Sequence, residues 1–282
     1  MTSKRTLRLA VEYDGAAFHG WQTQRTVRSV QGEIEEALQF VLQHPVRLAA
    51  AGRTDAGCHA LAQVASFKTP SPLPAANLLG AVNGLTGSDI CVHALEEAAP
   101  SFHARWSARW RDYSYVLGRN PSALLRDRVY VPSPWPDPER LAAAAALVVG
   151  TKDFIGLCNR STDNRRPVCA VHRVAWEEWS GGLVFRIRAD HFLYKMVRTL
   201  VGTCVEIGRG RWGVDRMEEI LKTGDRRLAA PPAPSGGLYF TGVGYEPEWE
   251  PAAAPLATPW WGATRPLALF EDTTSCASSK NR

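Results

Sequence analysis

Apolar and polar residues follow two different periods along the first hundred residues. In the segment 7–13 every second residue is apolar, which predicts a strand ending at the turn Asp14-Gly15. In the segment 30–42 the apolar residues recur every three or four positions behind Ser29, a typical N-cap, which predicts a helix. Further predicted elements are extended segments at 46–51, 63–68 and 89–96 and a helix at 75–84. The predicted order is β-α-β-β-α-β.

The second part of the chain repeats this succession. In the segment 109–117, alternation places Arg111, Tyr113, Tyr115 and Leu117 on one face of a predicted strand. The remaining predicted elements are a helix from the Asp137 cap and Pro138 to Gly150, strands at 168–176 and 183–189, helices at 192–207 and 214–222, and a strand at 238–245. This order is again β-α-β-β-α-β, with one extra helix.

Two such units in tandem predict the fold class and the domains. We expect an α+β protein with two ferredoxin- or RRM-like halves, whose antiparallel sheets join across a central cleft. The first half is expected to span residues 1–104 and the second 105–246. Residues 247–282 are rich in Pro and Ala and are expected to form a tail outside the core, with Trp260 and Trp261 packing back onto it.

Composition is that of a soluble globular protein. Of the 282 residues, 45% are hydrophobic and 22% are charged. The longest unbroken apolar run, 141–149, is too short to cross a bilayer, and the N-terminus lacks the apolar stretch of a signal peptide, so we expect a cytoplasmic protein without a membrane segment. The six cysteines are scattered and form no Cys-x-x-Cys pair, which predicts reduced, mostly buried thiols.

Basic residues are concentrated in two segments. The chain has 33 basic and 28 acidic residues, a net charge of +5. Six arginines lie in the segment 101–128 and ten basic residues in 186–227, with aromatic residues between them. Clustered Arg with Trp and Tyr suits phosphate contacts and base stacking, whereas a solvated surface of mixed charge would show similar numbers. Charge alone leaves both interpretations open.

The densest candidate for chemistry is the loop Gly52-Arg-Thr-Asp-Ala-Gly57. Its glycines allow a sharp turn that exposes a carboxylate two residues from a guanidinium, although an ordinary turn has the same composition. Gly208-Arg-Gly-Arg-Trp-Gly213 matches G-x-G-x-x-G but follows a predicted helix instead of a strand, so we interpret it as a chance match. The sequence contains no Walker A loop and no zinc deaminase signature, and we expect His59 and His103 to be hydrogen-bonding structural residues.

Around this loop the sequence resembles the tRNA pseudouridine synthase A family. The loop lies in Ala51-Gly-Arg-Thr-Asp-Ala-Gly-Cys-His-Ala60, and further motifs follow in the order of the family. They are Glu12-Tyr-Asp-Gly15, Phe18, Gly20-Trp-Gln22, Ser29-Val-Gln31, Phe102-His-Ala-Arg105, Tyr113-Ser-Tyr115, Asp153-Phe154, Phe192-Leu-Tyr-Lys-Met-Val-Arg198, Gly202 and Gly237-Leu-Tyr239. The resemblance covers residues 5–245. Cys58, Leu157 and His191 depart from the usual pattern without removing a residue that the chemistry requires.

The resemblance implies a reaction and a set of site residues. The family isomerises uridine to pseudouridine by moving the ribose C1′ from N1 to C5 of the base. Asp55 matches the catalytic carboxylate, as nucleophile or as base. Arg53 would enter the base stack and hold the flipped nucleotide by its phosphate, Tyr113 would stack on the uracil, and Arg198 would keep Asp55 ionised and oriented. Leu238 would line the apolar floor of the pocket.

The resemblance also implies partners. It implies a homodimer that holds one tRNA across both subunits, with uridines 38, 39 and 40 of the anticodon arm as targets, and it implies no cofactor and no metal. Two other classes stay open on sequence. A non-catalytic RNA-binding module would not need Asp55, and an RNA N-glycosidase would release uracil and need a second carboxylate.

Overall fold

A computed structural model describes residues 4–159, 167–246 and 259–267. The first part of the chain contains β1 (Arg5–Tyr13), α1 (Val30–Leu42), β2 (Ala49–Ala50), β3 (His59–Thr69), α2 (Ala75–Leu85) and β4 (Ile90–Ala98). The second contains β5 (Ala108–Gly118), α3 (Pro138–Ala146), β6 (Gly150–Asp153), β7 (Val168–Trp179), β8 (Gly182–Ala189), α4 (Met196–Gly208), α5 (Asp215–Thr223), β9 (Leu238–Tyr245) and β10 (Arg265–Pro266). Short 3-10 turns are η1 (Gly15–Ala17), η2 (Ile155–Leu157), η3 (Arg226–Leu228) and η4 (Ser235–Gly237).

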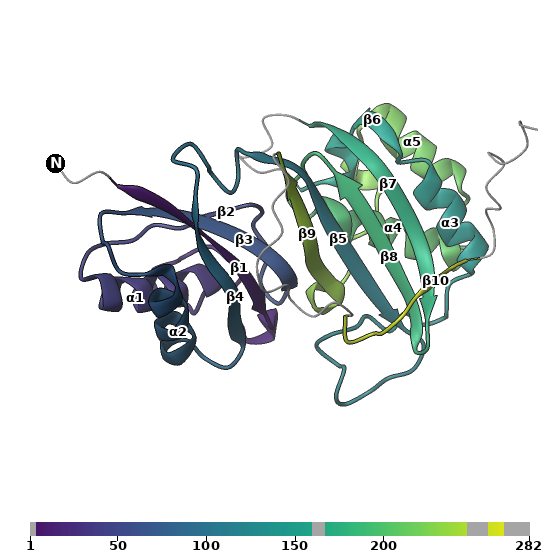
Figure 1. Cartoon of the computed structure of the whole chain (residues 1–282). Helices are drawn as coiled ribbons and strands as arrows, with labels where there is room; N and C mark the ends of the chain where they lie inside the picture. Colours follow the sequence, from purple (N-terminus) through teal and green to yellow (C-terminus); the bar gives the residue numbers. More distant parts are fainter. Residues whose placement is uncertain (1–3, 160–166, 247–258, 268–282) are drawn as a thin grey trace, which may run out of the picture.

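All these strands belong to one open sheet of ten strands. Its main path runs β10-β7-β8-β5-β9-β3-β1-β4, with β2 paired to β3 and β6 paired to β7. Neighbouring strands are antiparallel except β3 and β9, which pair in parallel through His59 with Tyr239 and Ala60 with Phe240. This short parallel contact joins the first part of the sheet to the second. Figure 1 shows β3 and β9 meeting at the centre of the molecule.

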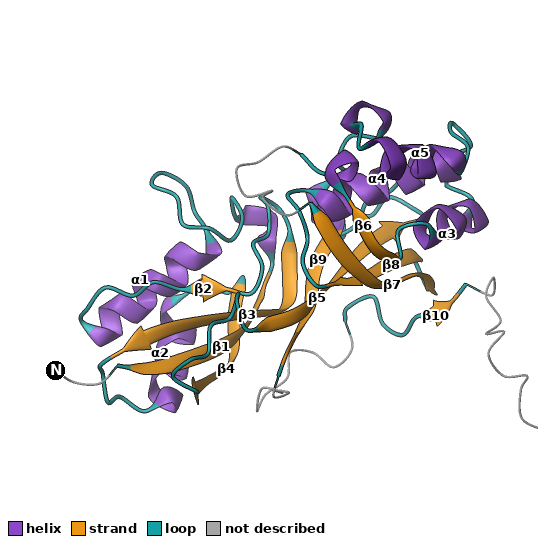
Figure 2. Cartoon of the chain, turned by 90° about the horizontal axis from the view of Figure 1, so that it is seen from above, coloured by secondary structure: helices purple, strands orange, loops and turns teal. Residues whose placement is uncertain are grey.

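The helices cover the sheet in two groups. Figure 1 shows α1 and α2 against the strands of the first part, and Figure 2 shows α3, α4 and α5 gathered on one side of the strands of the second part. Helix α1 begins where expected, because the Ser29 hydroxyl accepts a hydrogen bond from the Gly32 amide at 3.3 Å. Within the described residues, no helix combines the length and the apolarity that a bilayer crossing requires.

The predicted end of the third helix is wrong. Asp137 caps α3 and Pro138 is its first residue, as expected, but the helix ends at Ala146 instead of at Gly150. Gly150 has a φ of +100° and is the first residue of β6. The β-branched pair Val148 and Val149 disfavours the helix, and the glycine lets the chain turn into a strand that sequence analysis missed.

The mixed α+β class is confirmed. The strands form a single open sheet. The elements of the first part follow the predicted order β-α-β-β-α-β, whereas those of the second part depart from it. β2 is only two residues long, and β6 is an additional strand in the second part. The segment Gly150-Thr-Lys-Asp153 has no apolar alternation, so its pairing with β7 follows from tertiary contact and leaves no periodic signal in the sequence.

The hydrophobic core runs through both parts of the chain. One continuous cluster of buried residues extends from Leu7 in β1 to Tyr245 in β9. A smaller cluster contains Tyr239 and Trp261. The indole nitrogen of Trp260 donates to the Tyr239 hydroxyl at 3.1 Å, and the ring of Trp261 lies 5.0 Å from that of Tyr239. Trp260 and Trp261 thus pack back onto the fold at Tyr239, as expected, and the extent of the tail 247–282 stays a prediction.

Replacing Trp261 by Ala should therefore destabilise the fold. Trp261 is 2% exposed, and loss of a buried indole leaves a cavity, so we expect the free energy of unfolding to fall by about 3 kcal/mol. Trp106→Ala is the matched control, because Trp106 is 73% exposed and its loss should change the value by less than about 0.5 kcal/mol. Urea unfolding followed by circular dichroism measures both, and equal losses would contradict the packing described.

Candidate active site

Backbone and side-chain hydrogen bonds hold the loop between β2 and β3 in place. The Trp21 amide donates to the Thr54 carbonyl at 3.1 Å, and the hydroxyls of Tyr13 and Thr54 lie 2.7 Å apart. The side-chain amide of Gln63 donates to the Gly52 carbonyl at 2.8 Å. These contacts anchor the residues of the loop that directly precede Asp55.

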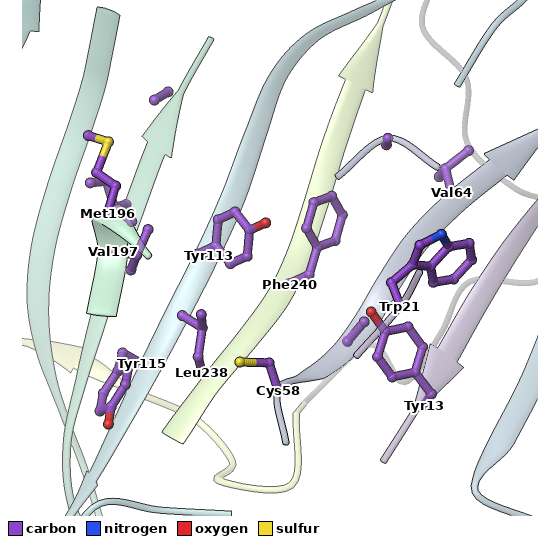
Figure 3. Close-up of a cluster of buried hydrophobic side chains, with 14 of the residues drawn as sticks. Tyr13, Trp21, Cys58, Val64, Tyr113, Tyr115, Met196, Val197, Leu238 and Phe240 are labelled. Carbon is purple, nitrogen blue, oxygen red and sulfur yellow. The ribbon is translucent and has the colours of Figure 1, made fainter. Parts of the chain in front are cut away.

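Gly52 brings the loop close to two aromatic rings. A Cβ atom at this position would lie 2.9 Å from Cε2 of Phe240 and 3.3 Å from the hydroxyl oxygen of Tyr113. Glycine is therefore required by close approach. Figure 3 shows Tyr113 and Phe240 side by side on neighbouring strands, with Cys58 nearby at the end of the loop.

Asp55 forms an ion pair with Arg198. The Nη1 atom of Arg198 donates to Oδ2 of Asp55 at 2.9 Å, and the two side chains are 14% and 22% exposed. Arg198 lies in the first turn of α4, and its Nε atom donates to the Ala233 carbonyl at 2.8 Å. The second bond fixes the plane of the guanidinium, which therefore holds the carboxylate in one orientation.

Tyr113 lies in the same region and is buried. Its ring makes edge contacts with Phe192 and Phe240, at centroid distances of 5.0 and 5.2 Å and interplanar angles of 87° and 86°. Burial raises the pKa of the Tyr113 phenol well above its ordinary value, and the nearby Tyr13, Cys58 and Asp55 raise it further. The phenol is thus neutral near pH 7 and can act as a stacking surface or a hydrogen-bond donor.

Two further predicted residues occupy different environments. Arg53 is exposed on the loop, two residues before Asp55. Leu238 is buried at the start of β9, where it pairs with Tyr115 of β5. The structure therefore brings Asp55, Arg198 and Tyr113 into one region. Arg53 lies on the exposed side of this region, and Leu238 lies in β9, the strand next to that of Tyr113.

Five side chains that build this region had no predicted role in the site, although Tyr13 and Phe192 lie in the family motifs and Arg111 was placed on the same strand face as Tyr113. They are Tyr13, Gln63, Phe192, Phe240 and Arg111. Arg111 offered the clearest signal, because it shares a strand face with Tyr113 and a basic residue on an inward-facing position is unusual.

Asp14 and His59 support the far end of the loop. His59 bonds the Asp127 carbonyl through Nε2 at 2.9 Å, and its Nδ1 lies 3.0 Å from both the Gly15 amide nitrogen and Oδ1 of Asp14. The predicted structural role of His59 is confirmed by these contacts. Asp14 also pairs with Arg128. Its hydrogen bond with His59, together with the Ala16 amide and Arg128, lowers the pKa of Asp14 to about 2.

Three side chains that could bind a metal ion lie close together in the second part of the chain. Ligand atoms of Cys169, Asp190 and His191 lie within 4.8 Å of one another. Burial, together with the negative charge of the neighbouring Asp190, raises the pKa of the Cys169 thiol to about 12. The thiol is therefore protonated near pH 7, and a metal ion that bound here would have to displace this proton.

The chain is similar to known proteins along most of its length. A sequence profile described as tRNA pseudouridine synthase matches residues 144–246. The tRNA pseudouridine synthase A of Chlorobaculum tepidum is 40% identical over 244 residues, which are 86% of this chain and 99% of the relative. That of Aromatoleum aromaticum is 41% identical over 243 residues, 86% of this chain and 92% of the relative. The chain belongs to the tRNA pseudouridine synthase A family.

Family membership confirms the resemblance that the loop motif carries. Among solved structures, a Cbf5-Nop10-Gar1 complex shows 13% identity and a TM-score of 0.37 over 84% of this chain and 50% of that chain, a likeness too low to bear on the fold. In this member of the tRNA pseudouridine synthase A family, the roles of Asp55, Arg53, Tyr113 and Arg198 stay predictions. What the structure adds is the contact between Asp55 and Arg198 beside Tyr113.

Replacing Gly52 by Ala should displace the aromatic rings beside the loop and destabilise the fold. The new methyl group has to displace the rings of Phe240 and Tyr113, so we expect a loss of about 1–3 kcal/mol in the free energy of unfolding. Gly80→Ala in α2 is the matched control, because its Cβ meets open space and the helix should gain about 0.5–1 kcal/mol. Urea unfolding of both variants checks this, and a stable Gly52→Ala protein would argue against the close approach.

Stability should depend on pH through Asp14. The pKa of Asp14 in the fold is about 2, below its ordinary value of 3.8, so its contribution is complete above about pH 4 and is lost as pH falls toward 2. Allowing for solvent screening, Asp14→Asn should lower the free energy of unfolding by about 1 kcal/mol at pH 6. Unfolding curves between pH 6 and pH 2.5 should show that the difference in the free energy of unfolding between the wild type and Asp14→Asn becomes smaller. A difference that grows on acidification would refute the assignment.

Proposed function

We propose that this chain isomerises uridine to pseudouridine at positions 38, 39 and 40 of the tRNA anticodon arm, with Asp55 as the catalytic carboxylate. The proposal is carried by the Asp55–Arg198 ion pair beside the buried Tyr113, in a chain that aligns with relatives named tRNA pseudouridine synthase A. In the reaction the bond from C1′ to N1 breaks, the uracil turns, and a bond from C1′ to C5 forms. C5 loses its proton and N1 gains one, so the reaction balances without oxidation or reduction.

The surroundings of Asp55 suit a single carboxylate that acts on the nucleotide. Its contact with Arg198 uses Oδ2, and among the described residues Oδ1 has no hydrogen-bond partner. Asp55 can attack as a nucleophile or remove the C5 proton as a base from this position. The partner of Asp55 is a guanidinium, whereas a hydrolytic glycosidase places a second carboxylate opposite the first to activate water. This difference favours isomerisation over release of uracil.

Arg53 and Tyr113 would handle the flipped nucleotide. A uridine inside a helical stem has to leave the stack, at a cost of a few kcal/mol. Arg53 is exposed on the same loop as Asp55, where it would fill the vacated space and bind the phosphate. Tyr113 would stack on the uracil, which returns about 1–3 kcal/mol, with Leu238 lining the apolar floor. The edge contacts with Phe192 and Phe240 fix the plane in which the base would lie.

The same proposal extends to the partner and the assembly. We expect the tRNA to lie in a cleft where the halves 1–104 and 105–246 meet, with the arginine-rich segments 101–128 and 186–227 along its phosphates. A homodimer in the cytoplasm would hold one tRNA across both subunits. A non-catalytic RNA-binding module on the same fold is the alternative, and it differs in having no need for Asp55.

The test compares the wild type with Asp55→Ala on unmodified tRNA transcripts that carry 5-tritiated uridine. Forming the new bond expels tritium to water, and we expect Asp55→Ala to lower the rate on the order of 1,000-fold or more while tRNA binding persists. Asp89→Ala is the control, because Asp89 forms a surface ion pair with Arg28 and should keep full activity.

Three outcomes separate the candidate functions. Tritium release by the wild type and by Asp89→Ala alone supports the proposal, and sequencing of the product then gives the modified positions. Binding of tRNA without tritium release by any protein would favour the binding module. Free uracil in the supernatant would favour the N-glycosidase.

A further inference from the structure

One arginine ties three backbone segments together beside the candidate site. In the described part of the chain, all hydrogen bonds of the Arg111 guanidinium go to backbone carbonyl oxygens. Nε donates to Ala51 at 3.1 Å, Nη1 donates to Asp190 at 2.7 Å and to Ala108 at 3.1 Å, and Nη2 donates to Arg105 at 2.6 Å. Four of the five N–H groups are thus used, each toward a fixed point of the main chain.

These carbonyls belong to the segments that carry the candidate site residues. Ala51 is the first residue of the loop that presents Asp55. Asp190 opens the segment between β8 and α4, which carries Phe192 against Tyr113 and leads to Arg198 in α4. Arg105 and Ala108 belong to the connection from β4 into β5. Arg111 itself precedes Tyr113 by two residues on β5, so both side chains leave the same face of the strand.

The chemistry of the side chain limits what can replace it. Burial lowers the pKa of Arg111, which means that taking this charge out of water is costly. Four carbonyl oxygens offset that cost only when all three segments stand in their positions. A lysine keeps the charge but presents its donors from a single point, so it cannot reach three segments at once.

We propose that Arg111 is a positioning residue that sets where the Asp55 loop stands relative to Arg198. The inference rests on the proposed function, because it concerns the geometry of the pair that would perform the reaction. The guanidinium bridges the backbone that leads into each partner of this pair. Loosening it should leave tRNA contacts in place but spoil the alignment of the carboxylate with the nucleotide.

The first experiment measures steady-state tritium release by Arg111→Lys and Arg111→Met at 25 °C. We expect kcat to fall about 10- to 100-fold for Lys and further for Met, with KM for tRNA within about threefold of the wild type. Arg8→Lys is the matched control. Arg8 is also a partly buried strand arginine whose pKa is lowered by burial, and it pairs with Glu96 away from the site.

The second experiment asks whether the loss acts through the ion pair. In a double-mutant cycle of Arg111→Lys with Arg198→Lys, a positioning role predicts that the double variant is no slower than the slower single variant. A merely structural role predicts that the two losses multiply.

Each failure has its own signature. A kcat for Arg111→Lys within twofold of the wild type, or losses that multiply in the cycle, would overturn the positioning role. So would failure of both Arg111 variants to fold at 25 °C, because the residue would then be required for the fold itself. If the wild type releases no tritium, or Asp55→Ala matches it, the proposed function fails instead.

Discussion

The site depends on the short parallel contact between β3 and β9. Only His59 with Tyr239 and Ala60 with Phe240 are paired there, directly after the loop that carries Asp55. Without this contact the sheet would be two sheets, and nothing in the backbone would hold Asp55 near a residue 143 positions further along the chain. Parallel pairing is slightly weaker per residue than antiparallel pairing, and here the stacking of His59 on Tyr239 at 4.7 Å strengthens it.

The ion pair between Asp55 and Arg198 lies at intermediate depth. Deep burial would cost several kcal/mol per ion in lost hydration, and full exposure would leave at most about 1 kcal/mol of attraction. At 22% and 14% exposure the two side chains stay ordered while the carboxylate can still be reached from outside. The Ala233 carbonyl shares the guanidinium, so the orientation of Arg198 does not depend on Asp55 alone.

Local signals in the sequence predicted the elements better than their connections. Ser29 and Asp137 marked helix starts because their capping bonds involve residues only two or three positions away. The family motif identified Asp55. Periodicity could not reveal that Tyr13 and Gln63 form hydrogen bonds with its loop, because these bonds join segments that are distant in the sequence. The strand β6 and the bonds of Arg111 were missed for the same reason, because both are satisfied by distant backbone.

Strand β7 lies near one end of the sheet, where an unpaired edge would invite pairing with a second chain. β6 covers residues 168–171 of this edge, and β10 covers residues 177 and 178. The Leu267 amide donates to the Trp176 carbonyl at 3.4 Å, and the remaining stretch, 172–175, carries the charge of Arg173, which discourages addition of a foreign strand. β10 and β6 together cover most of this edge of β7. A chain shortened before Arg265 would leave the backbone groups of residues 177 and 178 unpaired, and two such chains could pair through them in a concentrated solution.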